Sequence, residues 1–213
     1  VILIVDMSAS GIFGSGLQLK KNVCTEIASV LGFSAIKNND KIGLILFSNE
    51  LIKYIPPKKG KSHVLRVIRE LLYTEPNSQG TSIKNALDFL MKVSKRRCVV
   101  FLLSDFLDDK YWDSIKIVNR KHDLIGVNIY DPYEMALPNI GMTKVEDPET
   151  GSMFWIDTSY EPDLKQMNIE NNNMLNDLKK KTSKIGLDFI SISTAEDYVD
   201  PLMKFFKKRG KKY

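Results

Sequence analysis

The stretch VILIVDMSAS, residues 1–10, joins an unbroken run of five apolar residues to an aspartate and two serines. An apolar run of this kind is typical of a strand that is buried on both faces of a parallel sheet. Gly11, Gly14 and Gly16 follow the stretch and predict a loop. Ligands of open α/β sheets bind beyond the carboxyl ends of the strands. The stretch therefore predicts a central strand whose end carries oxygen ligands at a binding edge.

Apolar patterns with strand and helix periods alternate along the rest of the chain. Further strands are predicted at residues 41–47, 51–56, 98–104, 123–130 and 187–193. Helices are predicted at about residues 17–37, 63–73, 81–95, 111–120, 162–184 and 196–208. This alternation predicts an α/β fold with a central, mostly parallel sheet and helices on both of its faces.

Two segments are expected at an edge of this sheet. Segment 51–56 follows its neighbour after a short turn, and Pro56 and Pro57 are expected to end it. Prolines suit an edge strand because they cannot donate a ladder hydrogen bond. Residues 142–146 and 153–157 flank the turn sequence DPETG and predict a hairpin laid on the sheet edge. The hairpin either covers that edge, which we favour, or forms part of a partner surface.

Composition and charge narrow the class of protein. The 213 residues are 43% hydrophobic, which suits one domain spanning residues 1–213. The formal net charge is +5, but six positive charges lie in a basic tail at about residues 204–213. The remainder is close to neutral, so we expect a solvated tail and no nucleic-acid partner. Contact of the tail with an acidic partner, lipid headgroups or RNA is the alternative.

The expected location of the chain follows from its apolar runs and cysteines. No apolar run approaches the ~20 residues of a membrane-spanning helix, so no span is expected. Cys24 and Cys98 form no CxxC pair and predict buried thiols in a reducing compartment. His63 and His122 lack metal-ligand spacing. These observations predict a cytoplasmic chain.

Five oxygen-bearing side chains are predicted to meet at one rim of the sheet. Asp6, Ser8 and Ser10 follow the first strand, and alternate residues of an extended chain point the same way. Asp105 follows another apolar strand, and Thr81 lies at a helix N-cap position. Taken singly, each is an ordinary turn, loop or cap residue. Their shared position on the rim favours a single site.

The chemistry of this set indicates a hard divalent cation. Two carboxylates and three hydroxyls, without sulfur or imidazole, suit Mg²⁺, which prefers oxygen ligands and keeps several waters. Mn²⁺ and Ca²⁺ are compatible with the same donors, whereas zinc is disfavoured. If the hydroxyls bind directly and the carboxylates act mainly through water, the ion keeps much of its charge. It would then attract an external carboxylate.

The sequence resembles a known family at these residues. DMSAS resembles the Asp-x-Ser-x-Ser signature of von Willebrand factor A domains, and Thr81 and Asp105 occupy the other two positions of that family's metal-ion-dependent adhesion site (MIDAS). The chain is most similar to the bacterial branch called domain of unknown function 58. Stretches that carry this likeness include NNDKIGLILFS, LLSDFLDD and RKHDLIGVNIYDPYEMALPNIG. Together with others they span nearly the whole chain.

The resemblance implies a Rossmann-like three-layer sandwich with one antiparallel edge strand. It implies metal-site roles for Asp6, Ser8, Ser10, Thr81 and Asp105. It also implies protein–protein interaction rather than catalysis, often beside MoxR-type AAA ATPases in assembly or chaperone-like systems. Family members carry further sequence upstream, so we expect this chain to be the von Willebrand-like half of a longer protein. Many adhesion-type relatives have Asp-Gly where this chain, like the branch that it most resembles, has Asp-Phe.

Three functions compete on sequence grounds. The favoured function is a non-enzymatic, metal-dependent binding module whose cation is completed by an acidic residue of a protein partner. The alternative is a phosphohydrolase of the haloacid dehalogenase type, with Asp6 as nucleophile. In those enzymes a second Asp two residues later is the general acid/base, and here that position is Ser8. Nucleotide binding is disfavoured because GIFGSG matches neither phosphate-loop pattern.

Overall fold

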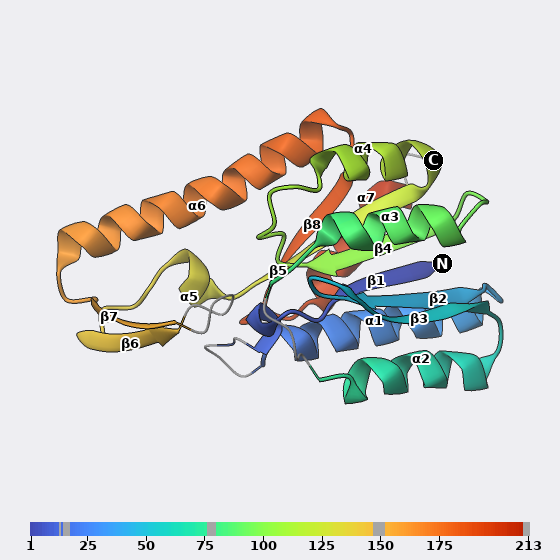
Figure 1. The fold of residues 1–213 in the computed structure, drawn as a ribbon, viewed down its shortest axis with the longest axis horizontal. Helices are drawn as coiled ribbons and strands as arrows, with labels where there is room; N and C mark the ends of the chain where they lie inside the picture. The colour runs from blue at the N-terminus through green and yellow to red at the C-terminus, as the bar shows by residue number, and fades with distance from the viewer. Residues whose placement is uncertain (13, 15–17, 76–79, 147–151, 211–213) are drawn as a thin grey trace.

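The computed structural model describes residues 1–12, 14, 18–75, 80–146 and 152–210, and it contains one six-stranded sheet (Figure 1). Its strands in spatial order are β3 (Leu51–Lys58), β2 (Ile42–Phe47), β1 (Ile2–Asp6), β4 (Val99–Ser104), β5 (Asp123–Tyr130) and β8 (Asp188–Ser193). All neighbouring strands pair in parallel except β2 and β3. The prediction of a mostly parallel sheet with one antiparallel edge strand is confirmed.

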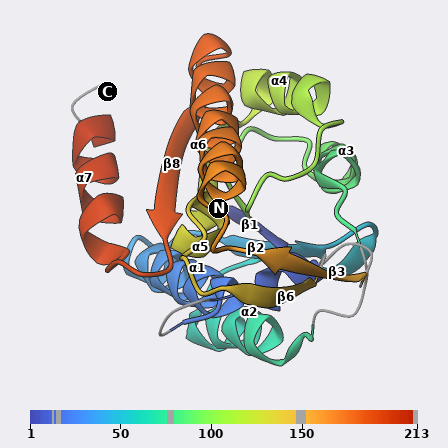
Figure 2. The same cartoon turned by 90° about the vertical axis from the view of Figure 1, so that its left-hand side faces the viewer.

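Helices cover both faces of the sheet (Figure 2). One layer contains α1 (Lys20–Lys37), α2 (Lys61–Tyr73) and α7 (Val199–Gly210). The other contains α3 (Ile83–Val93), α4 (Trp112–Lys121) and α6 (Glu161–Lys184). The shorter elements are η1 (Ala9–Ile12), α5 (Pro132–Met135), β6 (Met142–Glu146) and β7 (Met153–Asp157). The molecule is thus a three-layer sandwich of the Rossmann-like kind.

Strand β1 joins the two hydrophobic cores. Leu3 and Val5 pack into the core beneath α1 and α2, whereas Ile2 and Ile4 pack into the core beneath α3 and α4. All four side chains are buried, because successive residues of a strand point to opposite faces and both faces are covered. Burying each such side chain contributes about 1.5–3 kcal/mol. This burial fixes β1 at the centre of the sheet and places its carboxyl end at the rim.

The edge strand β3 differs from the prediction at its end. Pro56 and Pro57 do not end it, since the strand continues to Lys58. The pairing with β2 contains a register shift in this region, so the prolines lie where the ladder is irregular. A Cβ on Gly43 of β2 would lie 2.9 Å from the Pro57 ring, and glycine therefore allows the close approach. The edge position tolerates prolines without ending the strand.

The predicted hairpin exists but lies elsewhere. Strands β6 and β7 form their own two-stranded antiparallel sheet, so the expectation that the hairpin lies on the sheet edge is wrong. It projects beside α5 and the first turns of α6, away from β3 and β8 (Figure 1). Buried Thr158 holds its base, because its hydroxyl donates to the Gly141 carbonyl (2.8 Å) and accepts from the Ile140 amide (2.9 Å). The DPETG turn lies outside the described residues.

The C-terminal segment forms the predicted helix, and it differs from the expected solvated tail at Arg209. Helix α7 continues to Gly210, and Phe205 packs against the core. Arg209 forms ion pairs with Asp188 (2.7 Å) and with Asp123, which anchor the last turn to β8 and β5. The prediction is therefore wrong for Arg209, although Lys204, Lys207 and Lys208 are exposed. Among the described residues, no helix has both the length and the apolar character needed to cross a bilayer.

Candidate metal site

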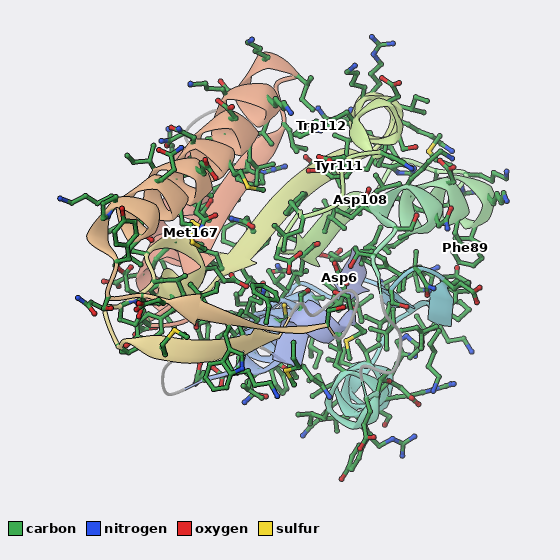
Figure 3. All side chains as sticks on the ribbon, turned by 60° about the vertical axis from the view of Figure 1, so that its left-hand side comes forward. Asp6, Phe89, Asp108, Tyr111, Trp112 and Met167 are labelled. Atoms are coloured by element: carbon green, nitrogen blue, oxygen red, sulfur yellow. The ribbon has the colours of Figure 1, made fainter. Side chains whose placement is uncertain are left out.

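The candidate site lies where the strand order reverses. The chain passes from β1 to β2 on one side and reaches β4 on the other, so the ends of β1 and β4 form the switch point at which open α/β sheets bind ligands. Asp6 is the last residue of β1, and Ser104 is the last residue of β4. The Ser104 hydroxyl donates to Asp6 Oδ2 at 2.6 Å and ties the two strand ends together. Figure 3 looks onto this rim, with Asp6 near its centre.

The loop after β1 brings its two serines together by a route that the sequence analysis did not predict. The chain does not stay extended, since residues Ala9–Ile12 form the 3₁₀ helix η1. The Ser8 amide donates to Asp6 Oδ1 (3.0 Å), and the hydroxyls of Ser8 and Ser10 lie 2.9 Å apart. Both serines are buried. The three predicted residues of this loop therefore gather at one place, by a tight turn rather than by strand alternation.

Asp105 borders the same space, and a lysine lies beside it. A small cavity of about 10 Å³ is lined by Asp6, Ser8, Ser10, Gly11, Lys20, Cys24, Ser104, Asp105 and Ile129. The Lys20 ammonium group contacts Asp105 Oδ2 at 3.0 Å and Glu134 Oε1 at 2.5 Å. The side chain of Lys20 is 3% exposed and that of Asp105 is 7% exposed. An ion pair with two carboxylates thus forms one wall of the site.

Helix α5 holds Glu134 in place. Asp131 caps this short helix, accepting from the Tyr133 amide at 2.9 Å, while Glu134 Oε2 accepts from the Asp131 amide at 2.9 Å. The Thr194 hydroxyl in turn donates to Asp131 Oδ2 at 2.7 Å. Both oxygens of Glu134 therefore have partners, one on its own helix cap and one on Lys20. The capping box therefore fixes a second carboxylate beside Lys20, in addition to Asp105.

Burial and charge set the pKa values of this cluster. Burial raises the pKa of the Asp6 carboxyl to about 7, the charge of Asp105 acts in the same direction, and hydrogen bonds from Ser104 and Ser8 oppose it. Burial disfavours the charged form of Lys20, but Asp105 and Glu134 outweigh this effect and raise the pKa of Lys20. Burial also raises the pKa of Glu134, against the opposing influence of Lys20. The cluster holds more acidic groups than its one ammonium ion can neutralise.

Thr81 differs from the other predicted ligands in its relation to this cavity. It does not line the cavity beside Asp6 among the described residues, and it precedes the N-cap of α3 rather than forming it. The cap is Ser82, whose hydroxyl accepts from the Asn85 amide at 3.3 Å and whose own amide donates to the Ser48 carbonyl. The N-cap expectation for Thr81 is therefore wrong by one residue. Its role as a metal ligand stays a prediction.

The loop after β4 has an unusual backbone. Phe106 follows Asp105 with φ +59°, a left-handed conformation that is rare for residues other than glycine. Its buried ring contacts Tyr111 and Phe189 with centroid distances of 5.9 and 5.4 Å. A Cβ on Gly126 of β5 would lie 3.3 Å from the Phe106 ring, so glycine leaves room for it. Packing of the ring holds the backbone that carries Asp105.

The donor set fits a hard cation. Oxygen atoms of Asp6, Ser8, Ser10 and Asp105 surround the cavity, and these are the ligands that Mg²⁺ takes, with waters completing its shell. Within the described ranges, no group of three or more His, Cys, Asp or Glu side chains is arranged to hold a metal. A site built mainly from hydroxyls does not need such a group. Asp6, Ser8 and Ser10 would hold the ion, which would supply an electrophilic position for an external carboxylate.

The fold and this rim define the class of the protein. A six-stranded, mostly parallel sheet with helices on both faces, and a β1 loop of the DMSAS type, is the architecture of von Willebrand factor A-like domains. The chain belongs to the family described as "Protein of unknown function DUF58", whose model matches residues 1–173. The expected family and fold are thereby confirmed.

Individual proteins agree with this assignment. The uncharacterized protein Rv1480 of Mycobacterium tuberculosis is 24% identical over 97% of this chain, which spans 66% of the length of that relative. The crystal structure of the conserved hypothetical protein BatB from Bacteroides thetaiotaomicron is similar, with a TM-score of 0.62, 14% identity and coverage of 99% of this chain and 98% of the other. The SpRpn10 VWA domain gives a TM-score of 0.54 at 11% identity, covering 95% and 93%. These likenesses concern the fold.

Two charged residues of the site were missed by the sequence analysis. The sequence analysis assigns no role in the site to Lys20 or to Glu134. One signal was available for Lys20, because a lysine in the first turn of a helix faces the positive end of the helix dipole. The pairing of Lys20 with Asp105 and Glu134 spans 85 and 114 residues and has no signature in the local sequence.

Proposed function

We propose that this chain is a metal-dependent protein-interaction module and not an enzyme. A divalent cation, with Mg²⁺ the first candidate and Mn²⁺ or Ca²⁺ compatible, binds at Asp6, Ser8 and Ser10, with Asp105 and Thr81 acting directly or through water. An Asp or Glu side chain of a protein partner completes its coordination. The supporting observation is that Asp6, the two serine hydroxyls and Asp105 line one cavity at the switch point of the sheet.

The balance of charge and hydroxyl groups supports a role in binding. Hydroxyls are neutral donors, so a cation held mainly by Ser8 and Ser10 retains most of its charge toward solvent. Two further features agree with binding rather than phosphoryl transfer. The position two residues after Asp6 is a buried serine, which lacks the acid/base capacity of a carboxylate. In the phosphohydrolase alternative Asp108 would be a metal-binding carboxylate, whereas here it accepts from the Ile83 amide (3.0 Å) at the start of α3.

The proposal also names a partner protein and a cellular compartment. Membership of the family supports a MoxR-type AAA ATPase as a partner in assembly or chaperone-like activity, in the cytoplasm. Cys24 and Cys98 are free thiols, which agrees with a reducing compartment. The acidic residue that completes the cation is expected on that ATPase or on a protein that the pair assembles.

A titration with metal alone tests the core of this proposal. Isothermal titration calorimetry of the chain with MgCl₂ should show one site, and Asp6→Asn should abolish it. Asp109→Asn is the matched control, because it removes an exposed carboxylate from the loop after β4 and should bind Mg²⁺ like the wild type. Absence of Mg²⁺ and Mn²⁺ binding at millimolar concentration would contradict the metal site.

Affinity purification tests the interaction itself. The tagged chain is incubated with the purified candidate ATPase in Mg²⁺ or in EDTA, and retention should require both the metal and Asp6. Equal retention with chelator would contradict a metal-dependent contact. Metal-dependent hydrolysis of p-nitrophenyl phosphate that disappears in Asp6→Asn would instead favour the haloacid dehalogenase alternative.

A further inference from the structure

We propose that the ammonium group of Lys20 is a tethered counter-ion of the metal site. It neutralises Asp105 when no divalent cation is bound, and it must give up Asp105 when a cation enters. Lys20 therefore sets the metal affinity of the site to a lower value than its oxygen ligands would otherwise give. This inference rests on the proposed function, because it concerns how the same cation is admitted.

The position of Lys20 requires a specific reason for its burial. It is the first residue of α1, where the helix dipole disfavours positive charge, and its side chain is 3% exposed. Lysine is almost never buried to this extent unless its charge is paired. Asp105 and Glu134 provide that pairing at 3.0 and 2.5 Å. The side chain is thus held inside the site by the carboxylates and not by any preference of the helix.

The charges around Lys20 leave a place for a second cation. Three carboxyl groups, those of Asp6, Asp105 and Glu134, meet one ammonium group. Asp6 is bound by the Ser8 amide and the Ser104 hydroxyl, which carry no net charge. Lys20 contacts the other two carboxylates. A divalent cation beside Asp6 would be attracted by all three acids and repelled by Lys20 at close range.

The size of the cavity also indicates that Lys20 must move when a cation binds. The cavity of about 10 Å³ has room for about one water molecule. Mg²⁺ keeps several waters, and a water or ion next to Asp105 Oδ2 would need the place that the Lys20 ammonium group now occupies. Among the residues that line the cavity, Lys20 has the longest flexible side chain, and its movement would open the space next to Asp105.

Glu134 provides the second position for the ammonium group. Its carboxylate is held by the amide of Asp131, the N-cap of α5, and it contacts the ammonium group independently of Asp105. Lys20 can therefore leave Asp105 and remain paired, which avoids an isolated buried charge. Entry of the cation then exchanges one partner of Asp105 for another, with Lys20 retained by Glu134.

Calorimetric titration with MgCl₂ alone tests the inference. Lys20→Met removes the charge and should bind Mg²⁺ at least about tenfold more tightly than the wild type. Lys21→Met is the matched control, since it removes the same charge from the next residue of α1 and should bind like the wild type. Lys20→Gln serves as a second variant, because its amide can still donate to the carboxylates if Lys20→Met does not fold. It should also bind Mg²⁺ more tightly.

The outcomes separate the inference from the proposed function. Wild-type binding that requires Asp6, with equal or weaker binding in folded Lys20→Met or Lys20→Gln, would overturn the role of Lys20 and leave the metal site intact. Absence of binding in the wild type and in both variants would overturn both. A second readout is the rise in melting temperature at saturating Mg²⁺, which should be larger in the Lys20 variants than in the wild type and in Lys21→Met.

Discussion

The rim around Asp6 and the β6–β7 hairpin differ in which side chains they bury. At the rim, polar groups are buried: Ser8 is 4% exposed and Lys20 is 2% exposed. On the hairpin, apolar groups are exposed: Met142 and Trp155 are each 64% exposed. Each buried polar group at the rim has a partner from a distant part of the chain or from its own turn. The difference teaches that the rim contributes to stability through paired charges, whereas the apolar face of the hairpin contributes little.

The largest expected effect is the loss of the buried ion pair. Metal-free Lys20→Met leaves Asp105 and Glu134 without their cation, and removing one partner of a buried pair costs about 3–5 kcal/mol. Chemical denaturation in EDTA should show a fall of this size in the free energy of unfolding. Lys21→Met should change it by less than about 0.5 kcal/mol. Equal stabilities of the two variants would contradict the importance of pairing at the rim.

The second effect is a pH dependence that belongs to Asp6. Its pKa in the folded chain is about 7, above the ordinary value of 3.8, so between these values the folded chain holds a proton that the unfolded chain has released. The free energy of unfolding should therefore fall as pH rises from about 4 to 7, by up to about 1.4 kcal/mol per pH unit. Denaturation curves in EDTA across this range should show the contribution in the wild type and not in Asp6→Asn. Parallel curves would refute it.

The third effect concerns the base of the hairpin. Thr158→Val removes a hydroxyl that bonds the Gly141 carbonyl and the Ile140 amide, which should cost about 1 kcal/mol. Thermal denaturation should detect this loss. Thr143→Val, at a half-exposed position of β6, is the comparison and should have a smaller effect. If Thr158→Val lowered the free energy of unfolding by more than Lys20→Met does, the hairpin and not the rim would contribute more to stability.

The smallest effect is expected on the exposed face of the hairpin. Trp155→Ser replaces a large side chain that is 64% exposed, and the free energy of unfolding should change by no more than about 0.5 kcal/mol. Denaturation midpoints of the wild type and the variant should nearly coincide. A loss of several kcal/mol would show that Trp155 supports the fold and that the two regions are less different than their exposure indicates.

Local sequence patterns were sufficient for the central sheet. The apolar run before Asp6 predicted β1, because burial on both faces requires apolar side chains at every position. The hairpin strands were predicted at the residues where they occur, since turn residues bound them. The position of the hairpin in the fold was not predicted, because a hairpin pattern does not specify which elements the hairpin packs against. The end of β3 was predicted too early for a similar reason. Only the pairing with β2 shows that the edge strand tolerates Pro56 and Pro57.

The candidate site was predictable only in part. The order Asp6, Ser8, Ser10 follows from the chain, and the structure gathers these residues with Asp105 around one cavity. The 3₁₀ turn that gathers them depends on a hydrogen bond from Ser8 to Asp6, which alternation does not show. The contacts of Lys20 join three distant segments, and long-range pairing of charges leaves no periodic signal in a single sequence.

Phe106 fixes the part of the rim that carries Asp105. A left-handed backbone at a residue other than glycine costs about 1–2 kcal/mol, and the buried ring between Tyr111 and Phe189 compensates for it. Movement of the loop that carries Asp105 would break the contacts of this ring with Tyr111 and Phe189. The loop is therefore expected to be rigid. A cation entering the site would therefore meet Asp105 in a fixed position, and the Lys20 ammonium group would be the part that moves.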